Sequence, residues 1–354
     1  MNGVKVNNPP YVIPSMKEIN DIPKQYKVVS TFSGCGGSSL GYKLAGLNVV
    51  WANEFVEAAQ EVYKLNHKNT ILNKEDIRTL AAENILNETK LDVGEIDILD
   101  GSPPCASFSM SGQRQKGWNK IRSYSDTNQY VDDLFFEFLR IAKGLQPKVI
   151  IGENVKGLVT GKAKGYFKLI LQEFKDIGYN VKAKVIKCDR LGVPTMRERL
   201  IFVATRNDLN IEPVFPKPKN YKRIVADAYI DEIKGEYKTM NPFLKPLWAR
   251  AVKENISSIA EISKKYYNKD TYYSHRIVLP HNSCNTLTTR ITHYHHKYPR
   301  TLTIPEIKAI SSFPEDFKLT GNFSKQWERI GRAVPPFMMK EVALAIKKDI
   351  LYKL

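Results

Sequence analysis

The feature that most constrains this chain is a regular alternation of apolar runs and amphipathic stretches between residues 27 and 206. The runs have the length and composition of buried strands, and the stretches between them show helical spacing. Such alternation predicts a parallel sheet with crossover helices. The expected fold is therefore a doubly wound, Rossmann-like α/β domain, which binds its ligands at the carboxyl ends of the strands. Strands are expected at 27–32, 48–52, 96–101, 148–152, 179–186 and 199–205, and helices most clearly at 55–65, 130–143 and 165–177.

The flanking segments differ from this alternating region. Residues 1–26 carry several Pro and Asn and little periodicity, so an N-terminal arm is expected. Residues 207–299 are rich in Pro, Lys, Tyr, Asn and His, with weak periodicity, which predicts an inserted second domain of irregular or β structure. Residues 300–354 regain regularity, and a terminal helix is predicted from Met339.

The charge of the chain is strongly positive, with 54 Lys and Arg against 37 Asp and Glu, a net charge of +17. Two interpretations are open: a basic surface that keeps the protein soluble, or a polyanionic partner such as nucleic acid, whose phosphates Lys and Arg bind. The sequence has no apolar run of the ~18 residues that a membrane span needs, and its N-terminus lacks an apolar secretory core. The protein is therefore expected to stay inside the cell.

A glycine loop follows the first expected strand, in the sequence Phe32-Ser33-Gly34-Cys35-Gly36-Gly37. Glycines there allow a tight turn and the close approach of backbone to a ligand. The loop is neither a full G-x-G-x-x-G motif, since Ser39 takes the third place, nor a phosphate-binding P-loop. Taken alone, it could be an ordinary turn.

Acidic residues at the ends of the next two strands strengthen the case for a ligand. The second strand ends in Asn53-Glu54, about 20 residues after Gly34, where a carboxylate can accept hydrogen bonds from ribose hydroxyls. Asp76, at a third strand end, could bind an adenine amino group. A nucleoside without a pyrophosphate fits a loop that has no cationic residue, and S-adenosylmethionine is the leading candidate.

Reactive side chains gather where later strands meet the same rim. Cys105 follows two rigid prolines, Pro103 and Pro104, after the strand that ends near Gly101. The other cysteines stand at 35, 188 and 284, and no C-x-x-C pair occurs, so neither a zinc site nor a disulfide framework is expected. A carboxyl group, Glu153, and two guanidinium groups, Arg197 and Arg199, also fall near strand ends. Each has a structural alternative, but together they indicate a catalytic centre.

These motifs occur in an order that resembles the cytosine-5 DNA methyltransferases of bacterial restriction-modification systems. The resemblance covers roughly residues 27–206 and 300–354. Its motifs are F-S-G-C-G-G (32–37), N-E (53–54), P-P-C (103–105), E-N-V (153–155), R-E-R (197–199), R-T-L-T-I-P-E (300–306) and G-R-A-V-P-P (331–336). The resemblance implies an S-adenosylmethionine-dependent catalytic domain at 27–206, an inserted target-recognition domain at 207–299, and a return to the catalytic domain at 300–354.

The resemblance also assigns roles to individual residues. The catalytic residues it implies are Cys105, Glu153, Arg197 and Arg199. The cofactor-binding residues it implies are Phe32, Ser33, Gly34, Cys35, Gly36, Gly37, Asn53, Glu54, Phe55, Asp76, Ile77, Pro104, Leu134, Arg332, Ala333 and Val334. The DNA-binding residues it implies are Ser107, Ser109, Arg114, Trp118, Lys120, Arg122, Thr286, Thr288 and Arg290. Thr286-Leu287-Thr288 is similar to the family's Thr-Leu pair near the flipped nucleotide.

Several positions depart from the family pattern. Ala106 and Thr195 each replace a common Gln, and Arg332 replaces the usual Asn of G-N-x-V. The resemblance therefore does not predict which contacts Arg332 makes near the cofactor and the domain junction. The segment between Gln113 and Leu134 is longer than is common, so the details of its catalytic loop do not transfer. We expect the loop 111–133 to act as a mobile lid over a flipped base.

The implied reaction is attack of Cys105 on carbon 6 of a flipped cytosine, with Glu153 and Arg199 neutralising charge on the ring and Arg197 supporting the thiolate or the base. It needs no metal, so none is expected despite His281, His293, His295 and His296. The implied partner is double-stranded DNA, bound by a monomer in the bacterial cytoplasm and nucleoid. A cognate restriction endonuclease in the same cell is also in keeping with the family.

Three other functions compete with this interpretation. An RNA cytosine-5 methyltransferase of the same fold would also be basic. A catalytically silent DNA-binding regulator would not need the set of Cys105, Glu153 and Arg199. An NAD-dependent dehydrogenase is disfavoured because the glycine loop lacks its third glycine.

Overall fold

A computed structural model describes residues 8–104, 122–124, 127–129, 133–160, 163–228 and 235–354. The chain forms two compact units that interleave along the sequence. The sheet unit comprises Glu18–Lys187, Glu198–Lys217 and Met338–Leu354. The second unit comprises Met1–Lys17, Cys188–Arg197 and Pro218–Phe337. Among the described helices, none is long and apolar enough to cross a membrane.

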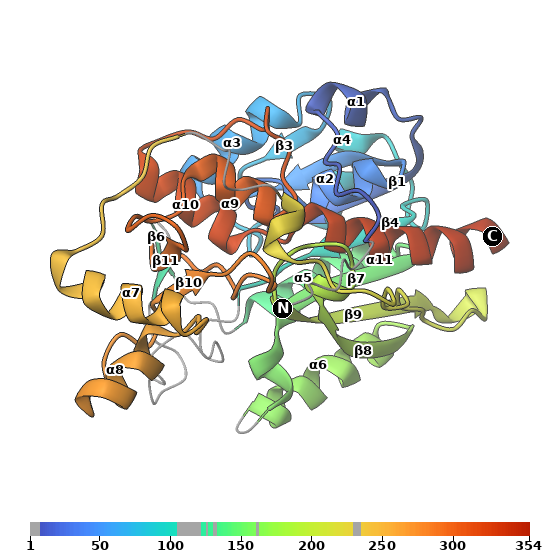
Figure 1. Ribbon diagram of the computed structural model, residues 1–354. Coiled ribbons are helices and arrows are strands. Elements are labelled where there is room, and N and C mark those ends of the chain that lie inside the picture. Colours follow the sequence, from blue (N-terminus) through green and yellow to red (C-terminus); the bar gives the residue numbers. More distant parts are fainter. Residues whose placement is uncertain (1–7, 105–121, 125–126, 130–132, 161–162, 229–234) are drawn as a thin grey trace. The chain divides into compact units, whose positions relative to one another are not determined.

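The sheet unit is built on a seven-stranded sheet with the order β3-β2-β1-β4-β7-β9-β8 (Figure 1). Strands β1, β2, β3, β4 and β7 run parallel to one another. This arrangement confirms the predicted Rossmann-like α/β class. The bounds are Gln25–Thr31 for β1, Leu47–Asn53 for β2, Ile71–Asn73 for β3, Ile98–Gly101 for β4, Val149–Val155 for β7, Tyr179–Lys187 for β8 and Glu198–Arg206 for β9.

The predicted parallel sheet with crossover helices does not extend to β9, which is antiparallel to both of its neighbours, β7 and β8. The segment 188–197 between β8 and β9 contains a short 3-10 turn, Cys188–Arg190, and no crossover helix. Because a parallel connection needs a crossover of a dozen or more residues, this short segment returns the chain in the opposite direction. The start of β9 therefore lies beside the end of β7, with Arg199 opposite Val155.

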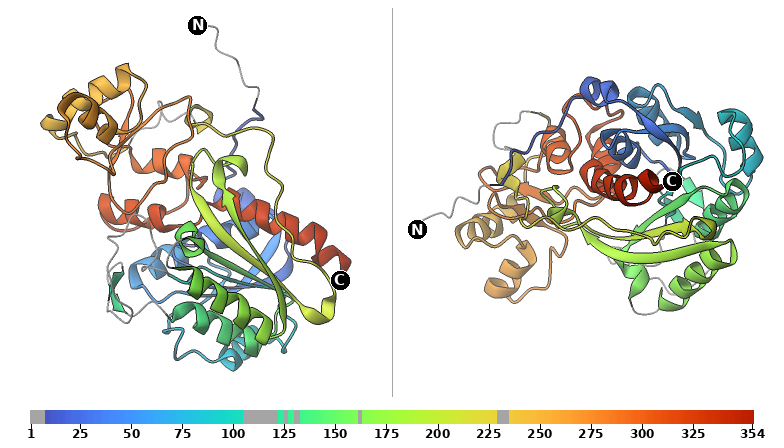
Figure 2. Two further views of the ribbon diagram at one scale, coloured as in Figure 1. Left: turned by 90° about the horizontal axis from the view of Figure 1, so that it is seen from below. Right: turned by 90° about the vertical axis from the view of Figure 1, so that its right-hand side faces the viewer.

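Helices cover both faces of the sheet, as a doubly wound fold requires. In the right-hand view of Figure 2, α11 and α6 lie on opposite sides of strands β8 and β9. Helices α4, α5 and α6 contact one another in sequence order, and α6 packs on β8. The bounds are Met16–Asp21 for α1, Gly37–Leu44 for α2, Glu57–Asn66 for α3, Ala82–Thr89 for α4, Leu134–Leu145 for α5, Lys164–Asp176 for α6 and Pro336–Asp349 for α11.

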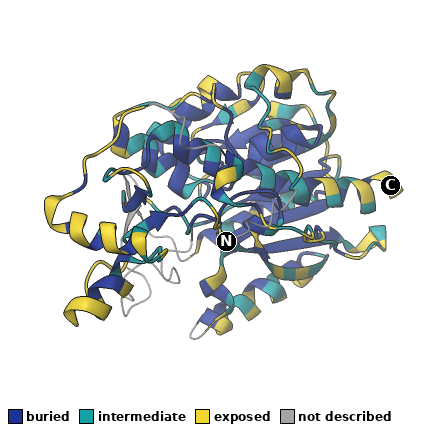
Figure 3. Ribbon diagram, viewed as in Figure 1, coloured by how far each residue is buried: buried dark blue, intermediate teal, exposed yellow. Residues whose placement is uncertain are grey.

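The core of the sheet unit is aromatic where α5 and α6 meet the sheet. Phe135 lies edge-on to Phe138, Phe174 and Phe202, with ring centroids 5.2 to 6.2 Å apart. Helix α5 comes this close because a glycine ends β4 beneath it: a Cβ at Gly101 would lie 2.6 Å from the Phe138 ring. The central strands β4 and β7 are accordingly buried, and buried residues are drawn dark blue in Figure 3. This packing holds the ends of β4 and β7 in place.

The second unit contains helices within the segment where irregular or β structure was predicted. Helices α7, Lys245–Lys253, and α8, Ile259–Tyr267, pack on a small parallel pair formed by β10, Arg276–Val278, and β11, His293–His295. Their apolar core includes Leu247, Ala251, Ile259 and Ile262, whose spacing of three to four residues is helical. Hydrophobic periodicity did not predict these helices because they contain few apolar residues. Helices α9, Ile304–Ile310, and α10, Phe323–Arg332, follow.

The described part of the N-terminal segment packs against the rest of the second unit, to which it belongs. The Tyr11 hydroxyl donates to the carbonyl of Ala309 at 2.8 Å, and the Asn8 amide donates to the carbonyl of Lys222 at 3.0 Å. The Arg223 guanidinium stacks on the Tyr11 ring, 5.4 Å from its centroid. Residues 8–17 are thus anchored by side-chain contacts that an apolar periodicity does not reveal.

Candidate active site

The glycine loop at the end of β1 turns the chain into α2 through left-handed backbone conformations. Phe32 has a φ of 51°, Gly34 of 55° and Gly36 of 95°. The amide of Gly36 donates to the carbonyl of Ser33 at 2.9 Å, which closes the turn. A Cβ at Gly36 would lie 2.1 Å from Nε2 of His67, whereas a Cβ at Gly34 would meet no atom within 4 Å. The protein's own packing therefore requires glycine at 36, and Gly34 borders open space in which a ligand fits.

The Glu54 carboxylate fastens this loop to the end of β2. One oxygen accepts the Gly34 amide and the other accepts the Val56 amide, both at 2.7 Å, and the side chain is buried. Each carboxylate oxygen has a second lone-pair direction, so it can still accept a hydroxyl hydrogen bond. The sequence predicted a ligand-binding role for Glu54; the role in holding the loop was not foreseen.

A buried polar pair supports the loop from below. Nζ of Lys43 lies 3.0 Å from Nδ1 of His67, and both side chains are buried. Burial lowers the pKa of Lys43 to about 8 and lowers the pKa of His67 well below its usual value, with the nearby lysine adding to the effect on His67. All residues of α2 are buried, and a lysine in the short helix that follows the glycine loop is the only signal of this pair in the sequence.

The remaining residues near β2 and β3 that were predicted to bind the cofactor differ in burial and in the contacts that they make. The Asn53 amide donates to Oδ1 of Asn73 at 3.0 Å and to the Glu75 carbonyl at 2.9 Å, so it ties β2 to the turn after β3. Asp76 is partly exposed and pairs with Arg78 at 3.2 Å. Phe55 is 42% exposed, while Ile77 is buried. Asn53 therefore stabilises the turn, whereas Asp76 and Phe55 remain accessible.

Most of the other residues in the sheet unit that were predicted to bind the cofactor are buried. Ser33 is buried and its hydroxyl donates to the Ser30 carbonyl at 2.9 Å. Cys35 and Leu134 are buried, and Gly37 begins α2. Pro104 is half-buried at the last described position before the nucleophile segment.

The predicted catalytic carboxyl group and one arginine form an ion pair at the same rim. Nε of Arg199 lies 2.7 Å from Oε1 of Glu153, with side-chain exposures of 15% and 10%. The neighbouring Asn154 amide donates to the carbonyl of Pro103 at 3.3 Å, which links the end of β7 to the P-P-C segment. The described chain thus brings Glu153 and Arg199 next to the prolines that precede Cys105.

Part of the predicted site lies outside the described residues. These positions are Cys105, Ser107, Ser109, Arg114, Trp118 and Lys120. Arg122 begins the strand β5, Arg122–Tyr124, which pairs antiparallel with β6, Thr127–Gln129. The predicted lid therefore includes a short hairpin in its described portion.

A further buried acid near this rim was not predicted. Asp100, in β4, accepts hydrogen bonds from the Ser30 hydroxyl at 2.9 Å and the Tyr42 hydroxyl at 3.0 Å. Burial raises the pKa of Asp100 to about 7, and the Glu153 charge adds to the rise while the two hydroxyl groups oppose it. Its position in an otherwise apolar strand was the signal in the sequence.

The second unit holds the other predicted arginine. The Arg197 side chain is buried and donates to the carbonyl of Gly331 at 2.9 Å and to that of Arg332 at 3.1 Å. It therefore fixes the end of α10, where the G-R-A-V segment begins. Nε of Arg332 donates to Oε1 of Glu328 at 2.9 Å, Ala333 is half-buried and Val334 is buried.

Among the residues predicted to contact DNA in this unit, Thr288 lies against the same helix. The carbonyl of Thr288 accepts the Trp327 indole N–H at 3.0 Å, and a Cβ at Gly331 would lie 2.4 Å from that carbonyl oxygen. Thr286 is half-buried and Arg290 is exposed. Arg197, Thr288 and the start of the G-R-A-V segment are thus brought together, while Glu153, Arg199 and the glycine loop are gathered in the sheet unit.

Comparison with known families identifies the class of protein. Residues 26–348 match the family of C-5 cytosine-specific DNA methylases, and the chain belongs to this family. It is accordingly a DNA (cytosine-5-)-methyltransferase that uses S-adenosylmethionine as methyl donor and DNA as substrate.

Individual relatives agree with this assignment. The type II methyltransferase M1.HphI of Haemophilus parahaemolyticus is 30% identical over 90% of this chain and 86% of its own length. M.NgoFVII of Neisseria gonorrhoeae is 29% identical over 94% and 89%. Among solved structures, a mutant of Spodoptera frugiperda DNMT2 superposes with a TM-score of 0.64 at 20% identity, covering 90% of this chain and 98% of that one, which supports the fold.

The residues around Gly34 fit S-adenosylmethionine. The open space beside Gly34 would hold a ligand against backbone, and Glu54 and Asp76 offer carboxylate acceptors for hydroxyl and amino groups. Phe32 and Phe55 offer aromatic surface for a purine ring. No Lys or Arg occurs within 32–37, in keeping with a nucleoside that lacks phosphates.

Proposed function

We propose that this enzyme methylates a cytosine within a specific DNA sequence by flipping the base and forming a covalent bond between Cys105 and carbon 6. The observation that carries the proposal is the ion pair of Glu153 and Arg199 beside the P-P-C segment. Carbon 5 of cytosine is a poor nucleophile. Addition of the Cys105 thiolate to carbon 6 makes the ring an enamine, which divides one difficult step into two easier ones.

Glu153 and Arg199 stabilise the charge that develops on the ring. Glu153, protonated or sharing a proton with ring nitrogen 3, neutralises negative charge there, and Arg199 donates to the ring's carbonyl oxygen. Their 2.7 Å contact and partial burial support this division of roles, because each group orients the other before the base arrives. Loss of the carbon-5 proton then allows the Cys105 bond to break.

The cofactor site is proposed to comprise the glycine loop, Glu54 and Asp76, with Phe32 and Phe55 against the adenine ring. S-adenosylmethionine, when bound, supplies an electrophilic methyl group. Glu54 holds the loop amide of Gly34 and accepts hydrogen bonds from the ribose hydroxyls through its remaining lone pairs. Arg197 is proposed to act as a positioning residue, since its guanidinium contacts are to backbone carbonyls of the G-R-A-V segment.

Base flipping follows from the chemistry, since carbon 6 of a stacked cytosine is shielded from a side-chain nucleophile. We assign sequence recognition to residues 207–299 and cover of the flipped base to the segment 111–133. The net charge of +17 fits phosphate contacts along a duplex. We further propose that the enzyme acts as a monomer near the nucleoid, and that it protects DNA from a cognate endonuclease, as the type II relatives' names suggest.

A covalent trap tests this mechanism. Bisulfite sequencing of a plasmid from cells that express the protein first identifies the methylated cytosine. A duplex with 5-fluorocytosine at that position should then stall after methylation, because fluorine cannot leave as a cation. The expected complex survives boiling in detergent, requires S-adenosylmethionine, and is absent with Cys105→Ser.

Cys188→Ser is the matched control, because Cys188 is a buried cysteine in the second unit with no role in the proposed mechanism. It should trap DNA as the wild type does. A trapped band with Cys105→Ser, or none with wild type on a duplex that it methylates, would contradict the covalent mechanism.

A further inference from the structure

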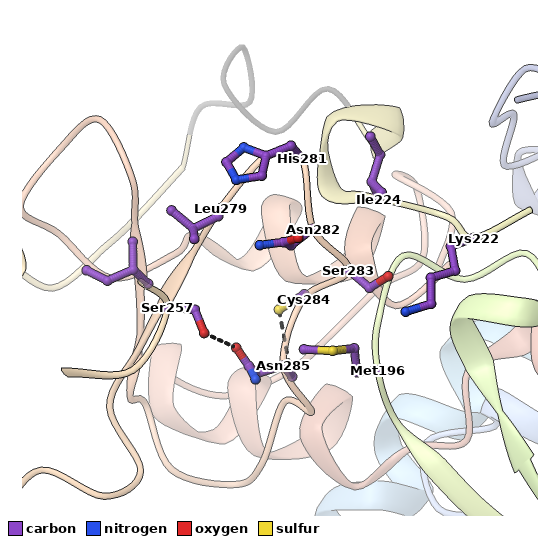
Figure 4. A pocket seen from close by; sticks show the side chains of 11 residues that line it. Met196, Lys222, Ile224, Ser257, Leu279, His281, Asn282, Ser283, Cys284 and Asn285 are labelled. Atoms are coloured by element: carbon purple, nitrogen blue, oxygen red, sulfur yellow. Dashed lines mark hydrogen bonds between the residues drawn. The ribbon is translucent and has the colours of Figure 1, made fainter. Parts of the chain in front are cut away.

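A cavity of about 260 Å³ lies within the second unit and has no role in the mechanism above (Figure 4). Met196, Ile277 and Leu279 provide apolar walls, and the side chains of Asn282, Asn285 and Lys222 add hydrogen-bonding groups. The Ser257 hydroxyl donates to Oδ1 of Asn285 at 3.1 Å, which fixes the orientation of that amide. Apolar walls with a few placed polar groups are typical of a small-molecule site.

The backbone ties this cavity to the two segments with predicted functions. The amide of Met196 donates to the carbonyl of Cys284 at 2.7 Å, and the amide of Cys284 donates to the carbonyl of Pro194 at 2.9 Å. Met196 immediately precedes Arg197. Asn285 immediately precedes the segment Thr286-Leu287-Thr288, which is predicted to contact DNA. A ligand in the cavity would therefore lie next to both segments.

The chemistry of the lining indicates what the cavity binds. No acidic side chain lines it, and the carboxylate next to its wall, Asp189, is already paired with Lys222 and accepts a hydrogen bond from the Ser283 hydroxyl at 3.4 Å. Burial raises the pKa of the Cys284 thiol, which therefore stays protonated and is unsuited to nucleophilic attack. The site is thus one for binding rather than for covalent reaction. Amides match the donor and acceptor pairs on nucleobase edges. The exposed Lys222 at the cavity wall pairs with Asp189 at 3.5 Å, so its charge is already balanced within the protein.

The volume fits a single base. The cavity, of about 260 Å³, has room for the ring system of one purine or pyrimidine. A base stacked in a duplex cannot enter a concave cavity, so the occupant must leave the stack. The methylated cytosine is proposed to bind at Glu153 and Arg199. The cavity lining contains no carboxyl group that could take the role of Glu153, so the cavity is not the site of that cytosine.

We propose that this cavity binds one nucleobase of the DNA substrate other than the methylated cytosine, and that Asn282 and Asn285 identify that base through its hydrogen-bonding edge. The inference rests on the proposed assignment of recognition to residues 207–299. It makes one position of the recognition sequence depend on these two amides. It also requires that position to be unstacked when the enzyme binds.

Methylation of substituted duplexes tests the proposal. Once the recognition sequence is known, kcat/KM is measured on duplexes that carry each single base-pair change, for the wild type and for Asn282→Ala and Asn285→Ala. We expect discrimination to fall by about tenfold to a hundredfold at one shared position and to stay unchanged elsewhere. Asn87→Ala, which removes an exposed amide on α4, is the control and should leave every position unchanged.

A fluorescence measurement addresses unstacking directly. 2-Aminopurine at the shared position should brighten when the wild type binds and should brighten less with Leu279→Trp, which fills the cavity. Thermal melting checks that each variant is folded. Equal losses on all duplexes, unchanged discrimination in folded variants, or no brightening with wild type would overturn the proposal. Covalent trapping at the methylated cytosine is scored separately, so failure of the Cys105 mechanism remains distinguishable.

Discussion

Replacing Gly36 by alanine should both destabilise the fold and disrupt the cofactor loop. An alanine at a φ of +95° costs about 1–2 kcal/mol in a left-handed conformation. Its Cβ would also lie 2.1 Å from Nε2 of His67, which must then move away from Lys43. Overpacking of this kind adds about 1–3 kcal/mol. Urea unfolding should therefore show a loss of about 2–5 kcal/mol in the free energy of unfolding.

Gly34→Ala is the matched comparison. Gly34 also has a positive φ, of +55°, but its Cβ would meet no atom within 4 Å. Its unfolding free energy should fall only by the strain of about 1–2 kcal/mol, whereas calorimetry should show weaker S-adenosylmethionine binding because the methyl group enters the ligand space. The ratio of the two effects distinguishes a glycine required by packing from one required by the ligand.

A double-mutant cycle isolates the contact with His67. If the overlap is the cause, Gly36→Ala should cost much less in the His67→Ala background than in the wild type, because the ring that it meets has gone. Equal costs in both backgrounds would refute the steric argument, as would a Gly36→Ala protein as stable as Gly34→Ala.

Three further substitutions test the rim of the sheet. Glu54→Ala should weaken S-adenosylmethionine binding by about 1.5–3 kcal/mol in calorimetry, since a charge-assisted acceptor is lost and the Gly34 amide is released; unchanged affinity would remove Glu54 from the site. The pKa of Asp100 is raised to about 7 in the folded protein, so its contribution to stability is present at low pH and lost as the pH rises through 7. The stability of Asp100→Asn relative to wild type should therefore increase between pH 4 and pH 8, by up to about 4 kcal/mol in urea unfolding, and a constant difference would refute the buried-acid account. Arg199→Ala should slow covalent trapping of 5-fluorocytosine DNA by an amount equivalent to about 2.7–4 kcal/mol, and an unchanged trapping rate would exclude a role in charge stabilisation.

The sequence by itself was sufficient for the parts of this protein that depend on local pattern. Apolar runs and helical spacing identified the α/β class, and most strand positions agree with the structure to within a few residues. The order of the F-S-G-C-G-G, P-P-C, E-N-V and R-E-R motifs pointed to the family that the comparisons confirm. These signals are readable because burial and turn formation are recorded in residue types close together in the chain.

Tertiary structure decided what depends on strand direction and on distant partners. A parallel strand over 199–205 would begin at the opposite edge of the sheet from the end of β7; the antiparallel direction of β9 is what brings Arg199 to Glu153. Hydrophobic periodicity is the same for both directions, so it cannot distinguish them. Likewise, nothing near Gly36 in the sequence shows that the His67 ring fills the space beneath it, and nothing near Arg197 shows that its guanidinium binds the carbonyl of Gly331. Both contacts join segments that only folding brings together.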